Sequence, residues 1–150
     1  MKKVFENFKG DWIIKRLIKD LHLNKSSQAN GIASFTQSNS EIDCLNYIEN
    51  GKLLLSEENK SINFTRKYIY KIADIRIDII LDDGVTKGEL FQSLFFENDE
   101  EIVKGSEHIC KLDKHNGTYT FIDENNFNIE YTVNGPKTNL LIRTEYSKVK

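Results

Sequence analysis

Hydrophobic and polar residues alternate with a period of two along most of the chain after its N-terminal segment. This alternation is the signature of β-strands, because successive side chains of a strand point to opposite faces of a sheet. Turn-forming residues separate the alternating runs at short intervals. We therefore predict strands over residues 12–19, 32–37, 44–49, 52–56, 64–72, 75–81, 88–96, 106–112, 118–122, 128–134 and 139–146.

Three segments depart from the simple alternation. Residues 4–9 place their apolar side chains on one side of a helical turn, which predicts a short helix. The dipeptide Asn50-Gly51 favours a two-residue hairpin of type I′, joining the strands on either side of it. The acidic stretch 97–104 predicts a solvated loop or a short helix that crosses the surface.

A succession of short strands without a long helical period is typical of an antiparallel sandwich or barrel. Several strands place aromatic and ionisable residues on one face and lysines or threonines on the other. Since lysines belong outside, the first face would point into a lumen wide enough for one small ligand. The alternative is that these charges lie on a solvated outer face. We predict an all-β fold, a single antiparallel up-and-down barrel of about eight to ten strands with a short N-terminal helix, in one domain over residues 1–150.

Composition narrows the function classes. The chain has 150 residues and a formal net charge of -2. This balance argues against a nucleic-acid binder that relies on a basic surface. No secretory signal and no apolar run of about 18 residues is present. Cys44 and Cys110 lie far apart and are expected to be reduced and buried. We predict a cytoplasmic monomer or homodimer with no membrane span.

Three charged residues, Arg16, Glu49 and Arg66, fall on the predicted inner face. A carboxylate between two guanidiniums satisfies itself, so a purely structural network is one interpretation. Two arginines against one glutamate leave one positive charge unbalanced. That surplus favours an anionic ligand, held by bidentate contacts to a carboxylate or phosphate.

His108 and Cys110 share a face of one predicted strand and, with Asp113 and His115, look superficially like a metal cluster. The latter two residues lie at or beyond the predicted strand end, so no metal site is predicted. A buried His108 that hydrogen-bonds Glu49 or a tyrosine, or acts as a general acid/base, is favoured. Cys110 as a nucleophile activated by His108 is geometrically possible but has no other support.

A family resemblance runs through nearly the whole chain in order. The stretches that carry it are GDWIIKRLI, GIASF, YIENGKL, RKYIY, HICKLDKHNGTY, VNGPK and the terminal TEY. On these segments the chain resembles an uncharacterised family of small lipocalin-like, calycin-type β-barrel proteins, a domain of unknown function. The resemblance implies the barrel fold and supplies no activity.

The resemblance also implies a structural role for Trp12. In lipocalin-like proteins this indole packs under the barrel, often with an arginine of the last strand across it, for which Arg143 is the candidate. The chain departs from the family pattern at three positions. Val85 stands where an arginine is expected, Gln92 where a histidine is expected, and His115 where an aromatic residue is expected.

We therefore predict a small-molecule-binding barrel whose ligand is an aromatic or amphipathic molecule with an anionic group. The expected ligand-binding residues are Arg16, Tyr47, Glu49, Arg66, Tyr68, Tyr70, His108, Cys110, Tyr119 and Tyr146. Structural roles are expected for Trp12, Gly51, Gly135 and Pro136, and neither a metal nor a cofactor is predicted. Two alternatives remain open: an enzyme that uses His108 as general acid/base in the same lumen, and a protein-interaction module with a filled barrel.

Overall fold

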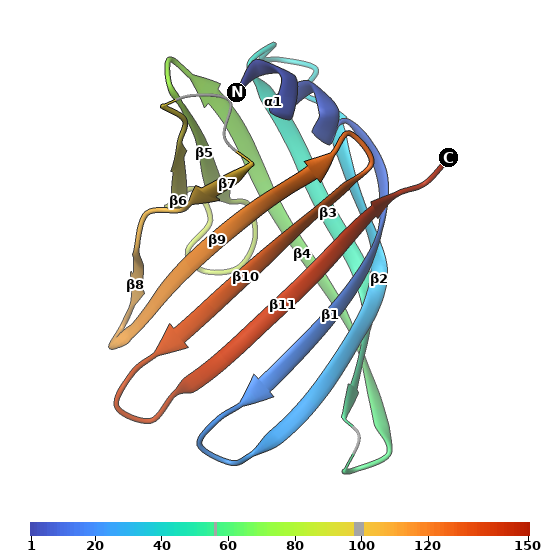
Figure 1. Cartoon of the computed structure of the whole chain (residues 1–150), viewed down its shortest axis with the longest axis vertical. Helices are drawn as coiled ribbons and strands as arrows, with labels where there is room; N and C mark the ends of the chain where they lie inside the picture. The colour runs from blue at the N-terminus through green and yellow to red at the C-terminus, as the bar shows by residue number, and fades with distance from the viewer. Residues whose placement is uncertain (56, 98–100) are drawn as a thin grey trace.

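The computed structural model describes residues 1–55, 57–97 and 101–150. These residues form one antiparallel sheet that coils into a nearly closed barrel, with a short helix across one end (Figure 1). The elements are α1 (Lys2–Phe8), β1 (Gly10–Asp20), β2 (Lys25–Gln37), β3 (Cys44–Leu55), β4 (Lys60–Ala73), β5 (Arg76–Leu81), β6 (Leu90–Phe95), β7 (Ile102–Lys104), β8 (His108–Cys110), β9 (Asp113–Asp123), β10 (Asn126–Asn134) and β11 (Asn139–Lys148).

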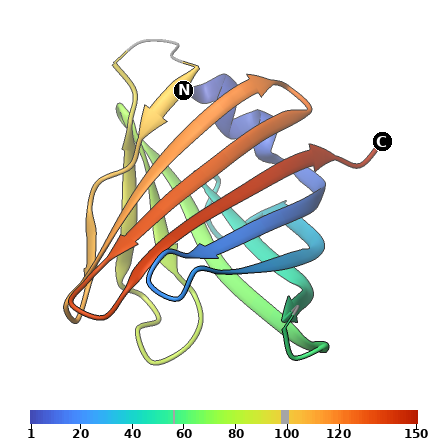
Figure 2. The same ribbon diagram turned by 60° about the horizontal axis from the view of Figure 1, so that its bottom comes forward.

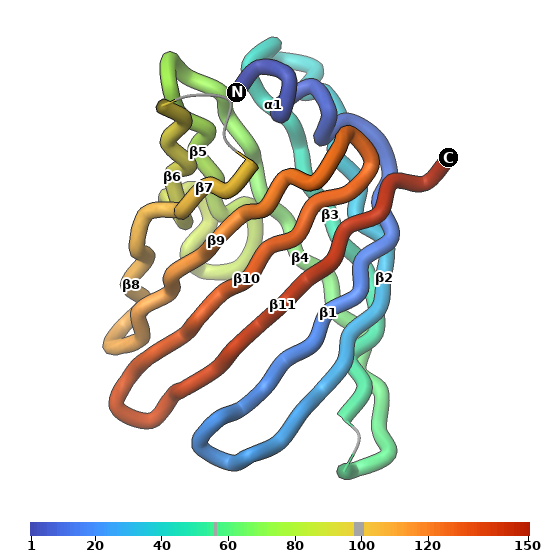
Figure 3. Tube along the Cα trace, in the orientation of Figure 1, coloured from blue at the N-terminus to red at the C-terminus, as the bar shows by residue number. Residues whose placement is uncertain are grey.

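The strands follow one another around the barrel in the order β6-β5-β4-β3-β2-β1-β11-β10-β9-β7, and β8 also pairs with β9. The first and last long strands therefore lie side by side, which the chain trace in Figure 3 makes visible. This arrangement confirms the predicted antiparallel up-and-down barrel with a short N-terminal helix. The described sheet has eleven strands rather than eight to ten, because two of them have only three residues each.

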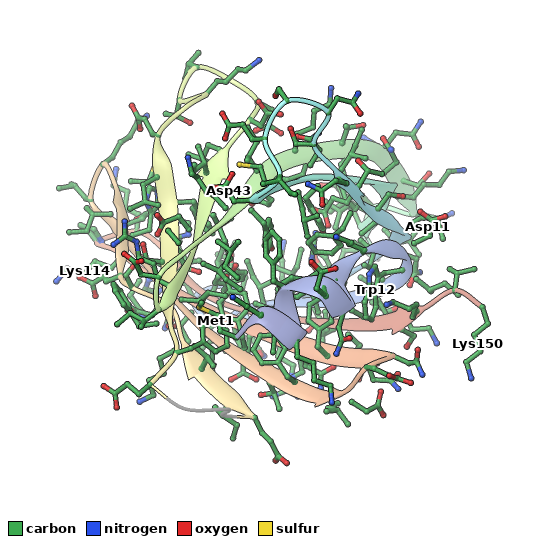
Figure 4. All side chains as sticks on the ribbon, turned by 90° about the horizontal axis from the view of Figure 1, so that it is seen from above. Met1, Asp11, Trp12, Asp43, Lys114 and Lys150 are labelled. Atoms are coloured by element: carbon green, nitrogen blue, oxygen red, sulfur yellow. The ribbon has the colours of Figure 1, made fainter. Side chains whose placement is uncertain are left out.

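The two ends of the barrel are built differently. Helix α1 lies across one end and buries Phe5 and Phe8 (Figure 4). The Phe8 ring stacks on Phe35 at 4.9 Å between centroids and meets the edge of Phe127 at 5.3 Å. The other end carries the long hairpin loops and has no such cover among the described residues (Figure 2). One end is packed, and the cavity described below lies toward the other.

The family resemblance implies a structural role for Trp12, and the residue lies in the packed end of the barrel. It is buried, and its indole N–H donates to the carbonyl of Phe8 at 2.8 Å, which ties β1 to the end of α1. The predicted partner from the last strand was wrong. Lys148 places its Nζ 4.9 Å from the indole centroid, whereas Arg143 points outward and pairs with Glu130. The alternation of β11 explains the error, because odd-numbered Arg143 lies on the opposite face from even-numbered Lys148.

The hairpin predicted at Asn50-Gly51 was wrong. Both residues lie inside β3, which runs without a break from Cys44 to Leu55, and Gly51 pairs with Gly31 of β2. A Cβ atom on Gly51 would lie only 2.8 Å from the Phe64 ring and would also meet a carbonyl of β2. Gly51 therefore serves close approach of neighbouring strands, the other common use of glycine within a strand.

The barrel has a seam, which we define as the boundary between β6 and the segment 102–110. Among the described residues, β6 forms no continuous ladder across it. A single bridge joins Leu94 to Gly105, and Ser93 and Ser106 exchange hydrogen bonds at 2.9 and 2.8 Å. The Gln92 amide adds a donor to the Ser106 carbonyl at 3.1 Å. Side-chain hydrogen bonds therefore supply much of the interaction across the seam.

Other predictions met mixed outcomes. The acidic stretch 97–104 contains strand β7, and its residues 98–100, like residue 56 of the predicted strand 52–56, lie outside the described residues. Gly135 and Pro136, for which structural roles are expected, occupy the loop between β10 and β11. The two cysteines are free, but Cys110 is exposed and only Cys44 is buried. No helix in the described ranges has the length and hydrophobicity to cross a membrane.

Candidate functional site

A cavity of about 280 Å³ opens inside the barrel, between the packed end and the loop end. Its lining residues come from β1, β3, β4, β9, β10 and β11 and from the start of β6. They are Arg16, Ile18, Tyr47, Glu49, Arg66, Tyr68, Tyr70, Phe91, His115, Ile129, Tyr131, Val133, Ile142, Thr144 and Tyr146. The barrel is therefore not filled by its own side chains.

Arg16 and Glu49 form a satisfied pair in the middle of the cavity wall. The two Nη atoms of Arg16 donate to the two carboxylate oxygens of Glu49 at 3.1 and 2.9 Å, and Nε donates to Thr144 Oγ1 at 2.8 Å. Burial disfavours the charged guanidinium, but Tyr146 and Glu49 outweigh that effect and raise the pKa of Arg16. The two side chains form an ion pair, and their formal charges cancel.

Three tyrosines form the floor of the cavity. Tyr47 donates to Glu49 Oε2 at 2.7 Å and lies 3.1 Å from the hydroxyl of Tyr146. The Tyr146 ring stacks on Phe127 at 4.2 Å, so its other side belongs to the packed end. Burial raises the pKa of Tyr47, Tyr70 and Tyr146. These phenols are therefore neutral near pH 7 and act as hydrogen-bond donors and acceptors, not as charges.

Arg66 is the second cation of the wall; it is exposed, and Tyr68 first, with Glu49 and Asp83 at longer range, raises its pKa. It pairs with Glu49 in the backbone register of β3 and β4, yet its side chain donates to the Tyr68 hydroxyl at 3.2 Å. No carboxylate of the described residues lies within ion-pair distance of Arg66. The lining thus carries two arginines against one glutamate, as the sequence predicted, and the surplus charge belongs to Arg66.

An aromatic row crosses the seam beside the cavity. The Tyr68 ring stacks on Phe91 at 5.6 Å, and Phe91 meets His115 at 6.1 Å and His108 at 4.9 Å. His108 and His115 are partners in the β8–β9 ladder, with ring centroids 5.6 Å apart. Of the two histidines, only His115 lines the cavity.

The structure brings together seven of the ten residues expected to bind a ligand: Arg16, Tyr47, Glu49, Arg66, Tyr68, Tyr70 and Tyr146. The other three lie elsewhere. His108 contacts Phe91 and His115 behind the lining, and Cys110 is exposed on β8. Tyr119 is buried and donates to Gln92 Oε1 at 2.7 Å. Strand β8 pairs with β9 over three residues only and adds little to the barrel wall, so Cys110 at its end is exposed.

His115 was not predicted as a lining residue because the predicted strand began too late in the sequence to include it. Strand β9 starts at Asp113, five residues before the predicted start at residue 118. The signal was present, since His115, Gly117 and Tyr119 alternate on one face. The apolar wall was also missed: Ile18, Ile129, Val133 and Ile142 come from β1, β10 and β11, where they alternate with residues on the outer face.

The departures from the family pattern fall at different depths. Val85 is fully exposed in the loop between β5 and β6. Gln92 is fully buried, and its amide links Tyr119 to the Ser106 carbonyl across the seam. His115 is the one of the three that faces the cavity.

One cluster outside the cavity has metal-ligand types. Glu41, Asp43 and Cys44 bring their ligand atoms within 4.8 Å of one another near the start of β3. The Cys44 thiol is within 3.0 Å of a Glu41 oxygen, and burial raises the pKa of Cys44 to about 12. The thiol is therefore protonated near neutral pH, a form that donates to carboxylates and is a poor metal ligand. His108, Cys110, Asp113 and His115 do not form such a cluster in the described chain.

Comparison with known proteins places the chain in a family. The family model for DUF6314, described as a family of unknown function, matches residues 8–148. The chain belongs to the DUF6314 family. This agrees with the predicted resemblance to a domain of unknown function with a lipocalin-like barrel. No curated protein matches this DUF6314 chain in sequence.

Solved structures share the fold of the DUF6314 chain. An S-type phycobiliprotein lyase from Guillardia theta matches with a TM-score of 0.69 at 9% identity, over 99% of this chain and 92% of that one. A protein of unknown function of the DUF3598 family from Nostoc punctiforme matches with a TM-score of 0.62 at 9% identity, over 96% of this chain and 48% of that one. The protein EF1p2_mFAP2b, solved bound to DFHBI, matches with a TM-score of 0.51 at 10% identity, over 99% of both chains.

Proposed function

We propose that this DUF6314 protein binds a small aromatic or amphipathic molecule with an anionic group in the lumen of its barrel. The observation that carries the proposal is the exposed guanidinium of Arg66, which forms no ion pair with the described residues, on the wall of a cavity of about 280 Å³. A guanidinium on a cavity wall that is not held in an ion pair with the protein is suited to an anionic group of a ligand. The volume lies just below the usual range of ligand pockets, about 300–1,000 Å³, which favours a small, flat molecule.

The two sides of the cavity fit such a molecule. Ile18, Ile129 and Ile142 offer an apolar surface on β1, β10 and β11, and Tyr68 and Phe91 offer ring faces across from it. Flat ligands gain from both kinds of contact. The phenol hydroxyls at the floor can fix a polar substituent. A barrel of the same fold, EF1p2_mFAP2b, was solved with the small molecule DFHBI bound, which supports a lumen of this type as a ligand site.

The alternatives have less support. An enzyme that uses His108 as general acid/base needs that imidazole in the lumen, and His108 is not part of the lining. An interaction module with a filled barrel is disfavoured by the cavity itself. A cytoplasmic location and a monomeric or dimeric state stay predictions from the sequence.

The first test asks what the purified protein carries. Native mass spectrometry and an absorption spectrum of freshly purified protein would report a co-purifying small molecule. Whatever the outcome, the fluorescent anion anilinonaphthalene sulfonate should bind, because it joins flat rings to a permanent negative charge. Fluorescence titration gives its Kd.

Arg66→Gln should weaken binding of this probe about tenfold, the effect of losing one charged hydrogen-bond partner. Arg143→Gln is the matched control, since it removes the same charge from an exposed arginine on the outer face. Equal Kd values for the two variants would contradict the placement of the anionic group at Arg66. A wild-type protein that does not bind the probe, and carries no small molecule, would contradict the function.

A further inference from the structure

His115 borders the cavity with two unengaged ring nitrogens. Its imidazole is held by ring contacts, with His108 at 5.6 Å and Phe91 at 6.1 Å between centroids. Within the described part of the chain, no group makes a hydrogen bond to either nitrogen. The neighbouring rings of Phe91 and His108 thus orient the imidazole, and its two nitrogen atoms are available to a ligand in the lumen.

His115 and Arg66 approach the same space from opposite sides of the seam. Arg66 extends from β4 and is anchored on the Tyr68 hydroxyl, and Tyr68 stacks on Phe91. Phe91 in turn contacts His115 of β9. The aromatic row therefore carries a guanidinium at one end and an imidazole at the other. Both line the cavity, and each acts electrostatically on the other.

We propose that Arg66 and His115 together hold the anionic group of the ligand, and that binding of the anion adds a proton to His115. This inference rests on the proposed function, and it adds the second residue of the anion site and the proton that accompanies the ligand. The ligand class is an aromatic molecule with a fully ionised acid group, such as a sulfonate, phosphate or carboxylate.

The surroundings of His115 keep it neutral until an anion arrives. Burial comes first and the neighbouring His108 second among the causes that lower the pKa of His115, and Arg66 acts in the same direction. Asp113, on the same strand, opposes them and is itself engaged with the Thr138 hydroxyl at 3.2 Å. Phe91 contacts the ring from β6, and Val133 is its register partner on β10; neither carries a charge, and Tyr131, which contacts Phe91, is neutral near pH 7.

The sign of the pH effect follows from this arrangement. In the free protein His115 is neutral at pH 7, because its pKa lies below the ordinary value of 6.5. A bound anion stabilises the imidazolium and raises that pKa. Affinity for a permanently charged anion therefore increases as the pH falls through the interval between the two values, and it levels off once the free protein is protonated.

A matched pair of probes tests the inference. Anilinonaphthalene sulfonate keeps its charge throughout the range from about pH 5 to pH 8, and N-phenylnaphthylamine has the same rings without the sulfonate. We expect the sulfonate to bind about tenfold more tightly at the acid end of the range than at the alkaline end, a change equivalent to one pKa unit at His115. The neutral probe should bind with a Kd that does not change with pH.

Two variants and one direct measurement complete the test. His115→Gln should make binding of the sulfonate independent of pH, and His22→Gln, in an exposed loop, should leave the pH dependence intact. Calorimetric titration of the wild-type protein with the sulfonate, in two buffers of different ionisation enthalpy, measures proton uptake directly. This measurement does not depend on the folding of any variant. Uptake near zero, or a pH dependence that survives in His115→Gln, would overturn the inference.

The outcomes separate the inference from the function beneath it. If the sulfonate binds, weakens in Arg66→Gln and shows no proton uptake, the lumen is an anion site and His115 has no part in it. If neither probe binds, the proposed function fails and the inference fails with it.

Discussion

The end of the barrel under α1 and the half that opens toward the hairpin loops differ in what fills them. Under α1, Phe8, Trp12, Phe35 and Phe127 pack ring against ring, and a hollow of about 600 Å³ at this end lies outside that cluster, between α1 and the pair Phe96 and Phe121. In the other half, one ion pair, several phenols and an apolar wall surround a cavity of about 280 Å³. The floor tyrosines belong to both halves, with their rings in the packed end and their hydroxyls at the cavity.

This contrast puts close apolar packing at one end of the barrel and the proposed ligand site toward the other. Close packing of apolar rings stabilises the fold without reference to any ligand. Polar groups around a cavity contribute less to folding and are free to contact something else. Substitutions in the two halves should therefore differ in kind as well as in size.

The largest effect should come from the packed end. Trp12→Ala should lower the free energy of unfolding by about 4 kcal/mol, because it removes a fully buried indole, its hydrogen bond to Phe8 and its contact with Lys148. Ile142→Ala, on the half-exposed cavity wall, should lower it by about 1 kcal/mol. Urea denaturation measures both. Equal losses would break the comparison, since the two halves would then contribute alike.

A smaller effect should come from the polar network. Glu49→Gln leaves Arg16 partly buried without its counter-charge, which should lower the free energy of unfolding by about 3 kcal/mol. The double variant Arg16→Met with Glu49→Leu removes both charges and should recover most of the loss. The double-mutant cycle measured by urea denaturation gives the coupling between the two residues. A coupling near zero would mean that water in the cavity replaces the pair, and the open half would then have no stabilising ion pair.

The smallest perturbation is chemical modification of the two cysteines, which reports how accessible each thiol is in the folded protein. Iodoacetamide at neutral pH should add one group, on exposed Cys110 beside the seam. Cys44 should stay unmodified until the protein unfolds, because burial raises the pKa of Cys44 to about 12 and little thiolate is present. Intact-mass measurement in native and denaturing buffer counts the adducts, and Cys110→Ser should show none in the native state. Two adducts on the native protein would mean that the region around Cys44 opens readily.

Much of the barrel could be predicted from alternation alone, because a period of two fixes which side chains share a face. Arg66, Tyr68 and Tyr70 were placed together in this way, and Arg16 likewise. The Asn50-Gly51 dipeptide was misleading because local turn preference competes with strand pairing. Here the ladders to β2 and β4 continue straight through it.

The remaining parts of the site depend on information that the sequence does not carry locally. Nothing near Arg66 in the sequence indicates that Glu49 bonds Arg16 and leaves the other guanidinium free. That choice depends on which strands meet across the lumen. His115 was missed for a simpler reason, because the predicted strand was too short to include it.

The seam between β6 and the segment 102–110 affects the diameter of the barrel. In a fully laddered barrel, strand number and stagger set the diameter, and no side chain can change it. Here the circumference is completed in part by the rings of Phe91, His108 and His115, which meet where the backbone ladder is interrupted. A larger or smaller side chain at position 91 would therefore change the width of the lumen while the rest of the sheet keeps its hydrogen bonds. Position 91 is therefore a single site at which the breadth of the lumen can be set.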